Sequence, residues 1–212
     1  MPEEIHTSTH QQKVRVFVDF WNFQLSLNEV VPDGYRPDWI RVRDWLVKRA
    51  QDLVLPDHSQ TLQFEGIHVY LSYNPKTTPG GKLHRWATTV LARFPGFDVT
   101  CLERKAKGPP TCPGCHQHIE DCPACGSKMI RTVEKGIDTA IVTEMITLAF
   151  EDAWHVAVLA SSDRDFIPAV SYLGKKGHKV IHAGFPPKGM DLASTCWASI
   201  DVRQGLSEIE LN

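Results

Sequence analysis

The chain lacks the features that would direct it to a membrane or give it a general attraction for nucleic acids. No apolar run approaches the roughly 18 residues that a membrane-spanning helix requires. Residues 1–13 are polar and lack the apolar core of a signal peptide, so we expect a flexible N-terminal tail there. The 23 Lys and Arg residues are outnumbered by 25 Asp and Glu residues, which gives a net charge of −2. Any contact with a nucleic acid must therefore depend on a local basic patch.

Cysteine is also scarce, with six residues in a chain of 212, and four of the six form two Cys-x-x-Cys pairs. This spacing, without a signal peptide, favours a reducing cytoplasm over a secreted fold held by disulfides. The hydrophobic content of 42% is that of an ordinary globular protein. The length predicts one domain with a small insertion. We place the domain at residues 14–203, the insertion at 108–130 within it, and a C-terminal tail at 204–212.

Short apolar runs alternate with helical patterns along most of the chain. The expected strands are 14–19, 66–73, 97–102, 155–160, 179–182 and 200–202, and the expected helices are 38–54, 81–93, 137–148, 167–173 and 191–196. Asp38 has the position of an N-cap for the first of these helices. Strands separated by helices imply right-handed crossovers, so we predict a three-layer α/β fold around a mainly parallel sheet of about six strands.

Acidic residues follow the ends of the predicted strands. Asp163 and Asp165 come one residue apart after an apolar run, Asp19 closes the first strand, and Asp138 begins a helical pattern. Each could simply cap a helix or begin a turn, and Asn22 could be an ordinary turn residue. Several carboxylates gathered at one sheet edge, however, raise one another's pKa unless a cation neutralises them. A divalent metal is the simplest such cation.

The sequence resembles the NYN-domain proteins, which are LabA-like members of the PIN-like nuclease superfamily. The matching motifs are Val-Asp19-Phe-Trp-Asn22, Lys135-Gly-Ile-Asp138 and Ser162-Asp163-Arg-Asp165-Phe, followed by the Gly-His-Lys-Val pattern at 177–180. These motifs extend over residues 14–203 apart from the cysteine-rich insertion. Their order and spacing make the resemblance specific, although each motif alone is weak.

The resemblance implies a metal-dependent ribonuclease that uses Mg²⁺ or Mn²⁺ to activate water for attack on a phosphodiester bond. Asp19, Asp138 and Asp163 would bind the metal directly, and Asp165 would bind it directly or through water. The resemblance further implies that Asn22 and Ser162 orient the phosphate or the attacking water. No nucleophilic side chain is then required.

Three residues near these motifs carry open interpretations. Many relatives have an Asp six residues after the acid at position 138, where this chain has Glu144. Two helical positions six residues apart differ by about 120° in direction, so Glu144 joins the site only if Asp138 precedes the helix or the longer side chain reaches back. Lys135 would contact the acids or the scissile phosphate, or lie in solvent. Arg164 would contact the substrate or the rim of the sheet.

The insertion contains the pairs Cys112–Cys115 and Cys122–Cys125, each with the spacing of a zinc knuckle. Four thiolates predict a structural Zn²⁺ site that folds the insertion and leaves no open position for chemistry. The alternative is a pair of unliganded or redox-active motifs. A basic flank that includes Lys105 and Lys107 precedes the pairs, and it would grip phosphates or be an ordinary solvated loop.

The predicted function is hydrolysis of RNA, with internal cleavage favoured and RNA as the partner. The chain could also form a homodimer. Two other classes stay open. One is a non-catalytic RNA-binding or regulatory module, which the presence of Glu144 in place of Asp keeps open. The other is a metal-dependent phosphohydrolase that acts on DNA or on another phosphate ester.

Overall fold

Six parallel strands form the sheet at the centre of the molecule in the computed structural model, which describes residues 11–57, 60–129 and 131–211. In spatial order the strands are β3 (Phe97–Glu103), β2 (Gln63–Tyr73), β1 (Lys13–Asp19), β6 (Val156–Ala160), β7 (Lys179–Gly184) and β8 (Ala198–Asp201). The predicted parallel sheet of about six strands is confirmed.

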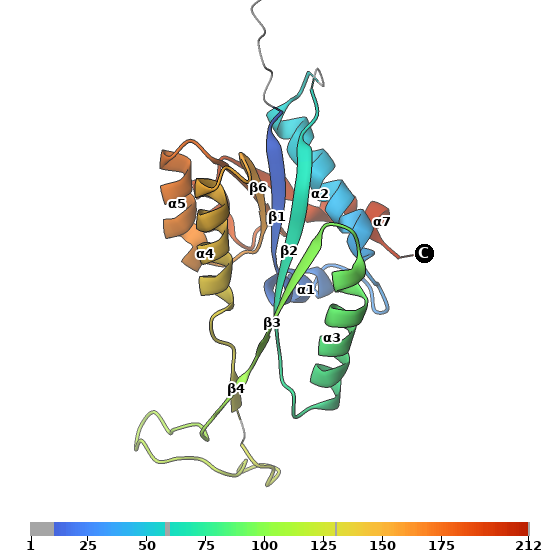
Figure 1. Cartoon of the computed structure of the whole chain (residues 1–212). Coiled ribbons are helices and arrows are strands. Elements are labelled where there is room, and N and C mark those ends of the chain that lie inside the picture. The colour runs from blue at the N-terminus through green and yellow to red at the C-terminus, as the bar shows by residue number, and fades with distance from the viewer. Residues whose placement is uncertain (1–10, 58–59, 130, 212) are drawn as a thin grey trace, which may run out of the picture.

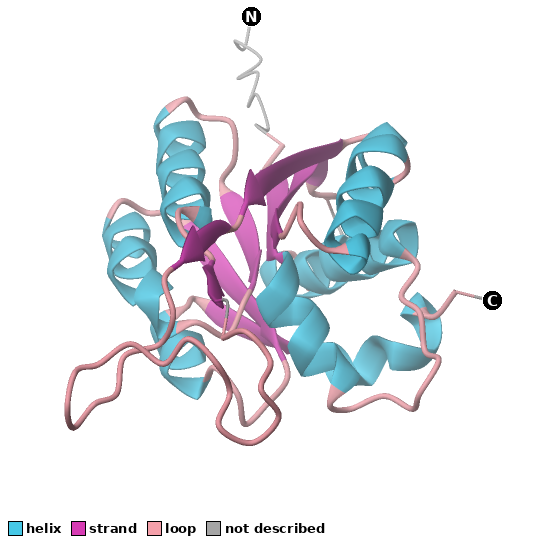
Figure 2. Cartoon of the chain, turned by 90° about the horizontal axis from the view of Figure 1, so that it is seen from below, coloured by secondary structure: helices cyan, strands magenta, loops and turns pink. Residues whose placement is uncertain are grey.

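Helices cover both faces of this sheet (Figures 1 and 2). One face carries α1 (Phe20–Asn28), α2 (Trp39–Val54), α3 (Thr78–Thr89) and α7 (Leu206–Ile209), and the other carries α4 (Ile137–Phe150), α5 (Ile167–Lys175) and α6 (Met190–Thr195). None of the helices in the described residues is both long and apolar enough to cross a membrane.

The sequence of β1 explains how one strand supports two helical layers. Val16 and Val18 lie in the core cluster beneath α1, α2 and α3, whereas Phe17 between them lies in the cluster beneath α4 and α5. Successive residues of a strand point to opposite faces, so a run that is apolar throughout is buried on both sides. This burial holds the carboxyl end of β1 firmly in the middle of the sheet.

The strand order reverses direction at β1. From β1 the chain proceeds outward to β2 and β3, and it then returns through α4 to β6 on the other side of β1. Open α/β sheets bind their ligands in the crevice at the carboxyl ends of strands where this reversal occurs. Here that crevice lies between the ends of β1 and β6.

The cysteine-rich insertion leaves the domain on a two-stranded antiparallel ribbon, β4 (Lys105–Lys107) and β5 (Arg131–Val133). We call this ribbon the stalk. Figure 1 shows the insertion extending beyond the carboxyl ends of the sheet strands, below α3 and α4. The insertion therefore projects on the same end of the molecule as the crevice.

Three expectations differ from the structure. The helix expected at 81–93 begins three residues earlier, because Thr77 accepts a hydrogen bond from Gly80 N and Pro79 fits a first helical turn. The segment 204–212, expected to be a tail, instead includes α7, which buries Ile209 and pairs its end with the start of α2. The expected N-terminal tail lies largely outside the described residues, and Lys13 already belongs to β1.

Candidate functional site

The ends of β1 and β6 bring two of the predicted acidic motifs together. Val18 pairs with Ala160, so Asp19 and Ser161 lie side by side where the strands end. The Ser161 hydroxyl donates to Asp19 Oδ2 at 3.1 Å, and Asp163 N donates to Ser161 Oγ at 3.2 Å. Ser161, which the sequence motifs did not single out, therefore links the acid of β1 to the acid that follows β6.

Asn22 connects the first turn of α1 to the same loop. Its Oδ1 accepts a hydrogen bond from Ser162 N at 2.8 Å, and its own backbone N donates to Asp19 Oδ1 at 3.3 Å. Asp19 is thus the N-cap of α1 as well as a member of the acidic site. The two interpretations of this residue are compatible, because each of its oxygens has a separate partner.

Three carboxylates converge above this loop. One oxygen each from Asp138, Asp163 and Asp165 lies within 4.8 Å of the other two. We call these three residues the aspartate triad. Asp163 caps the short 3-10 helix η2 (Arg164–Phe166) and accepts from Asp165 N at 2.9 Å. Asp138 occupies the first turn of α4, whose N-cap is Gly136 at φ 91°, a left-handed conformation that glycine adopts readily.

The acids of this site repel one another. Burial raises the pKa of Asp138, and the charges of Asp163, Glu134 and Asp165 raise it further. Asp19 is 5% exposed, and its burial raises its pKa to about 6 against the lowering effect of the hydrogen bonds from Asn22 and Ser161. Since carboxylate oxygens are the ligands that Mg²⁺ and Mn²⁺ prefer, the triad and Asp19 fit a divalent cation chemically.

Glu134 is a further acid that the motifs did not predict. Its charge raises the pKa of both Asp19 and Asp138, so it lies close to the site. Its carboxylate accepts a short hydrogen bond from the Ser72 hydroxyl and pairs with Arg104 Nη2 at 3.1 Å. Its position directly before the Lys-Gly-Ile-Asp motif was the available signal.

The structure does not bring Glu144 to the triad. Asp138 lies inside α4 and not before it, so the two side chains point in different directions around the helix. Glu144 Oε2 instead accepts from the Tyr70 hydroxyl at 2.5 Å, and its Oε1 lies 3.0 Å from His68 Nδ1. Glu144 therefore packs against the middle of β2.

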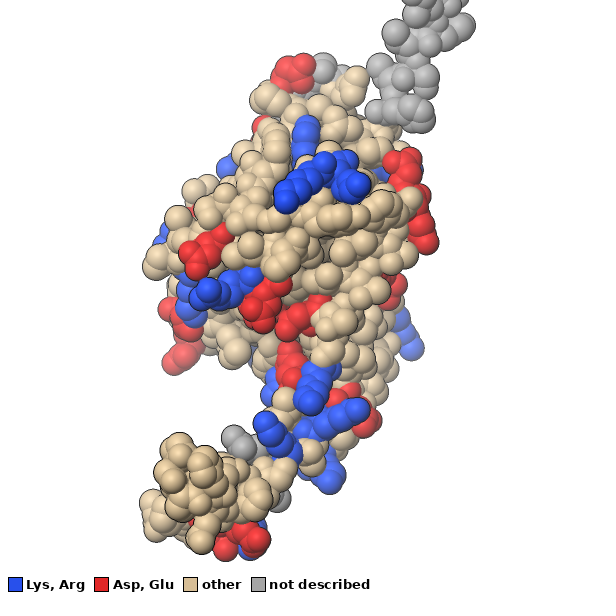
Figure 3. Space-filling view, turned by 90° about the vertical axis from the view of Figure 1, so that its left-hand side faces the viewer, with Lys and Arg blue, Asp and Glu red and all other residues tan. Residues whose placement is uncertain are grey.

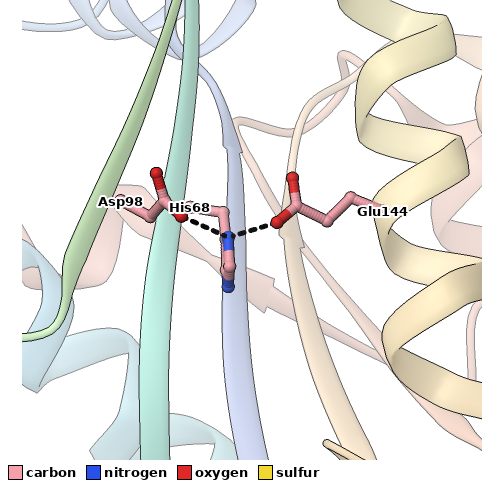
Figure 4. A group of neighbouring side chains, drawn as sticks. All are labelled: His68, Asp98 and Glu144. Carbon is pink, nitrogen blue, oxygen red and sulfur yellow. Dashed lines mark ion pairs between the residues drawn. The ribbon is translucent and has the colours of Figure 1, made fainter. Parts of the chain in front are cut away.

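His68, Asp98 and Glu144 form a second group of possible metal ligands, which we call the histidine group (Figure 4). His68 Nδ1 lies between the two carboxylates, 3.9 Å from Asp98 Oδ2. Its other ring nitrogen, Nε2, lies 2.9 Å from Arg15 Nη1. Because a guanidinium can only donate, Nε2 accepts and Nδ1 carries the ring proton of the neutral imidazole.

This protonation argues against a metal in the histidine group. A metal on Nδ1 would need the proton on Nε2, where metal-bound histidines normally donate to an acceptor. Burial lowers the pKa of His68, against the opposing charge of Glu144, and so favours the neutral ring. His68 thus acts as the protein's own partner for these carboxylates, and Arg15 holds the ring through Nε2.

The predicted basic residues are exposed and lie on different elements. Lys135 precedes Gly136 and is exposed, and Arg164 is exposed beside Asp163. Lys105 and Lys107 are exposed on the stalk. On the face that α4 and α5 cover, Figure 3 shows Lys and Arg side chains gathered where the insertion leaves the domain, next to Asp and Glu side chains.

Each cysteine pair of the insertion forms its own tight turn. Cys112 N donates to Gln117 O, and Cys122 N makes the corresponding bond to Ser127 O. Backbone N–H groups of Cys115 and Gly114 lower the pKa of the Cys112 thiol. Among the described residues, the sulfurs of the two pairs do not form a group of three or more within 4.8 Å. The structure therefore shows two separate turns, and the zinc site expected from their spacing stays a prediction.

Comparison with known proteins identifies a family over most of the chain. The family model described as NYN domain matches residues 13–202. A solved structure, that of a protein of unknown function from Vibrio parahaemolyticus RIMD 2210633, is similar with a TM-score of 0.55 and 19% sequence identity. The similarity covers 96% of this chain and 99% of that one, and at this identity it supports the fold alone. No curated protein matches the chain.

Proposed function

Since the chain belongs to the NYN-domain family and has its PIN-like nuclease fold, we propose that it is a metal-dependent ribonuclease that cleaves RNA internally. The observation that carries the proposal is the convergence of Asp138, Asp163 and Asp165 above Asp19, at the point where the strand order reverses. Burial and the charges of neighbouring acids raise the pKa values of Asp138 and Asp19, which is typical of sites that work with a cation.

The acids have distinct tasks in this proposal. Asp138 and Asp163 bind the metal, with Asp165 as a third ligand on the exposed side and Asp19 on the buried side. When bound, Mg²⁺ or Mn²⁺ polarises the scissile phosphate and lowers the pKa of the attacking water. Ser161 keeps Asp19 oriented through its hydroxyl, so the carboxylate does not need to reorganise when the substrate arrives.

Polar and basic residues around the acids position the RNA. The Asn22 side-chain oxygen accepts from Ser162 N, which fixes the orientation of the amide. The amide N–H₂ group then donates to a phosphate oxygen or to the attacking water. The Ser162 hydroxyl shares this task. Lys135 and Arg164 contact the phosphates on either side of the cut, and Lys105 and Lys107 extend the contact along the stalk.

A circular single-stranded RNA tests this proposal directly. Such a substrate has no ends, so only internal cleavage converts it to a linear product. We expect Mn²⁺ or Mg²⁺ to support this conversion, a chelator to stop it, and a circular DNA of the same sequence to be cut at least tenfold more slowly. RNA binding without cleavage under any metal would favour the non-catalytic module, and preferential cutting of DNA would favour the other phosphohydrolase.

We further propose that the insertion binds one structural Zn²⁺ through Cys112, Cys115, Cys122 and Cys125. The two turns supply two thiolates each, and a tetrahedral site at Zn–S distances of about 2.3 Å would join them. Elemental analysis of the purified protein should find one zinc per chain, and Cys112→Ser should lose it.

The matched control is Cys196→Ser, which removes a cysteine that packs beside the α5 side of the core. This variant should retain its zinc. Loss of zinc in Cys112→Ser should increase amide exchange in residues 108–129 and leave exchange in β1 and β6 unchanged. A wild-type protein without zinc would contradict the proposed site.

A further inference from the structure

A pocket of about 320 Å³ adjoins the acidic site on its β2 side. Trp21 of α1 lines it, together with residues from the end of β2 and the start of α3. The next residue, Asn22, lines a separate pocket with Ser162 and Asp163. The first turn of α1 thus separates two recesses, and Asp19, which caps this turn, lies at their shared boundary.

The pocket and the acidic site share a wall. Arg104 lines the pocket and pairs with Glu134, whose charge raises the pKa of Asp19 and Asp138. Arg104 Nε also donates to the Ser72 hydroxyl at 2.9 Å. The pocket is therefore next to the acids, because a single ion pair between Arg104 and Glu134 connects its lining to the acidic site.

The aromatic side chains of the pocket are held in fixed orientations. The Trp21 indole N–H donates to Ser72 O at 2.6 Å, and the Arg104 guanidinium lies 5.1 Å from the centre of the Trp21 ring. Tyr73 stacks on His84 with ring centres 4.3 Å apart. Rings held in this way stack on a planar ligand without losing much conformational freedom.

The rest of the lining combines apolar and polar groups. Leu83 and Pro79 supply apolar surface, and Gln24 and Asn74 supply donors and acceptors at the rim. The volume lies at the lower end of the roughly 300–1,000 Å³ of small-ligand sites. A flat heterocycle with polar edges matches this lining, whereas a phosphate or a metal ion would leave the aromatic surface unused.

We infer that this pocket binds one nucleobase of a single-stranded RNA, next to the phosphate that is cleaved. The inference rests on the proposed ribonuclease function. A base in a duplex is stacked and paired, so it cannot enter a recess lined by aromatic rings without being extruded. The pocket consequently makes the protein selective for unpaired RNA, and the base that it holds sets the position of the cut.

Fluorescent base scanning tests the inference with the full-length protein. A single-stranded RNA carries 2-aminopurine at one position at a time, and its emission is measured on binding in the presence of chelator. We expect a strong emission change at the position beside the cleavage site. Removing that base to leave an abasic nucleotide should weaken binding about tenfold, within the range of base–aromatic stacking, and other positions should show much smaller effects.

Tyr73→Leu is the matching protein variant, and Tyr172→Leu is its control. Tyr172 is an exposed tyrosine on α5 that contacts Phe150, on the face of the sheet opposite to the pocket. Tyr73→Leu should abolish the position-dependent emission change and reduce the preference for single-stranded over hairpin RNA. Tyr172→Leu should behave like the wild type, and melting curves establish that both variants fold.

The possible results separate this inference from the ribonuclease proposal. Cleavage with equal effects of all abasic positions, and equal rates on single strands and stems, would overturn the inference and leave the ribonuclease proposal standing. A clear position effect on binding without any cleavage would support the pocket and overturn the ribonuclease proposal. If Tyr73→Leu and Tyr172→Leu reduce the emission change equally, the inference is wrong.

Discussion

Two groups of acidic side chains lie on the same side of the sheet, and both include a residue of α4. The aspartate triad joins Asp138 to the loop that follows β6, whereas the histidine group joins Glu144 to the middle of β2 and the start of β3. Burial raises the pKa of Asp138 in the triad, and the charges of Asp163 and Asp165 raise it further. In the histidine group, His68 lies 3.0 Å from the Glu144 carboxylate on one side and 2.9 Å from the Arg15 guanidinium on the other.

The difference shows that residue types alone do not define a metal site. Both groups offer three ligand atoms within 4.8 Å, but only the histidine group contains a basic side chain whose donor direction is fixed by Arg15. The two groups also differ in where they lie along the strands, which decides whether a substrate can reach them. The triad sits past the strand ends, where backbone leaves the sheet and a substrate can approach, whereas His68 is 6% exposed within β2.

The largest expected effect separates the two groups through matched Asp→Asn changes. Asp163→Asn should reduce RNA cleavage by at least 100-fold, because it removes one ligand charge from the triad. Asp98→Asn, the same substitution in the histidine group, should leave cleavage within about twofold. Initial rates at saturating Mn²⁺ measure both variants, and thermal melting confirms that each is folded.

Two results would undo this distinction. Full activity in Asp163→Asn would remove Asp163 from the site. A comparable loss of activity in Asp98→Asn would mean that the histidine group, and not only the triad, takes part in metal binding.

A second prediction concerns the stability of the metal-free protein and comes from Asp19. Folding raises its pKa from 3.8 to about 6, so the folded state favours the protonated carboxyl. Protonated Asp19 stabilises the folded state by about 3 kcal/mol, and this contribution is complete below pH 3.8. It decreases above that pH and is lost as the pH rises through about 6. In chelator, the wild type should therefore lose stability between pH 5 and pH 8.

Asp19→Asn isolates this effect, because its amide cannot ionise and the other titrating groups stay the same. Denaturant unfolding of both proteins at pH 5 and pH 8 gives the difference in unfolding free energy between the variant and the wild type. Between pH 5 and pH 8 we expect the variant to gain about 1.4 kcal/mol on the wild type, because at pH 5 the wild type has already lost more than half of the effect, and we expect Mn²⁺ to remove this gain. An equal pH dependence in the two proteins would show that Asp19 is not the titrating group.

The sequence predicts the acids at the strand ends because their placement follows from the chain itself. An apolar run that ends in Asp19 or in Ser161–Ser162–Asp163 must place these residues at the carboxyl edge of a parallel sheet. The parallel order of the strands follows in the same way from the alternation with helices. These features depend on local patterns and on topology, both of which a single sequence carries.

The surroundings of the acids are less accessible to sequence reasoning. Whether Glu144 reaches the triad depends on where α4 begins, and that depends on one glycine in a left-handed conformation at position 136. The pairing of Arg15 with His68 joins residues 53 positions apart on two strands, and no local pattern indicates it. The aromatic pocket likewise requires the register of β2 and α3 against α1.

A third prediction, with only a small expected effect on activity, concerns Glu144 in the histidine group. Glu144→Gln keeps an oxygen that accepts from the Tyr70 hydroxyl but removes the charge that faces His68. The loss of a charge-assisted contact should cost about 1–2 kcal/mol of unfolding free energy. Cleavage should stay within about threefold of the wild type, because Glu144 lies away from the triad.

Asp98→Asn is again the comparator, this time for stability. The Asp98 side chain is 69% exposed and lies 3.9 Å from His68, so its replacement should change the unfolding free energy by less than about 0.5 kcal/mol. Denaturant unfolding and initial cleavage rates are measured on the same preparations. If Glu144→Gln kept its stability but lost cleavage 100-fold, Glu144 would belong to the catalytic acids, and α4 would have to present Asp138 and Glu144 to one metal despite the angle between them.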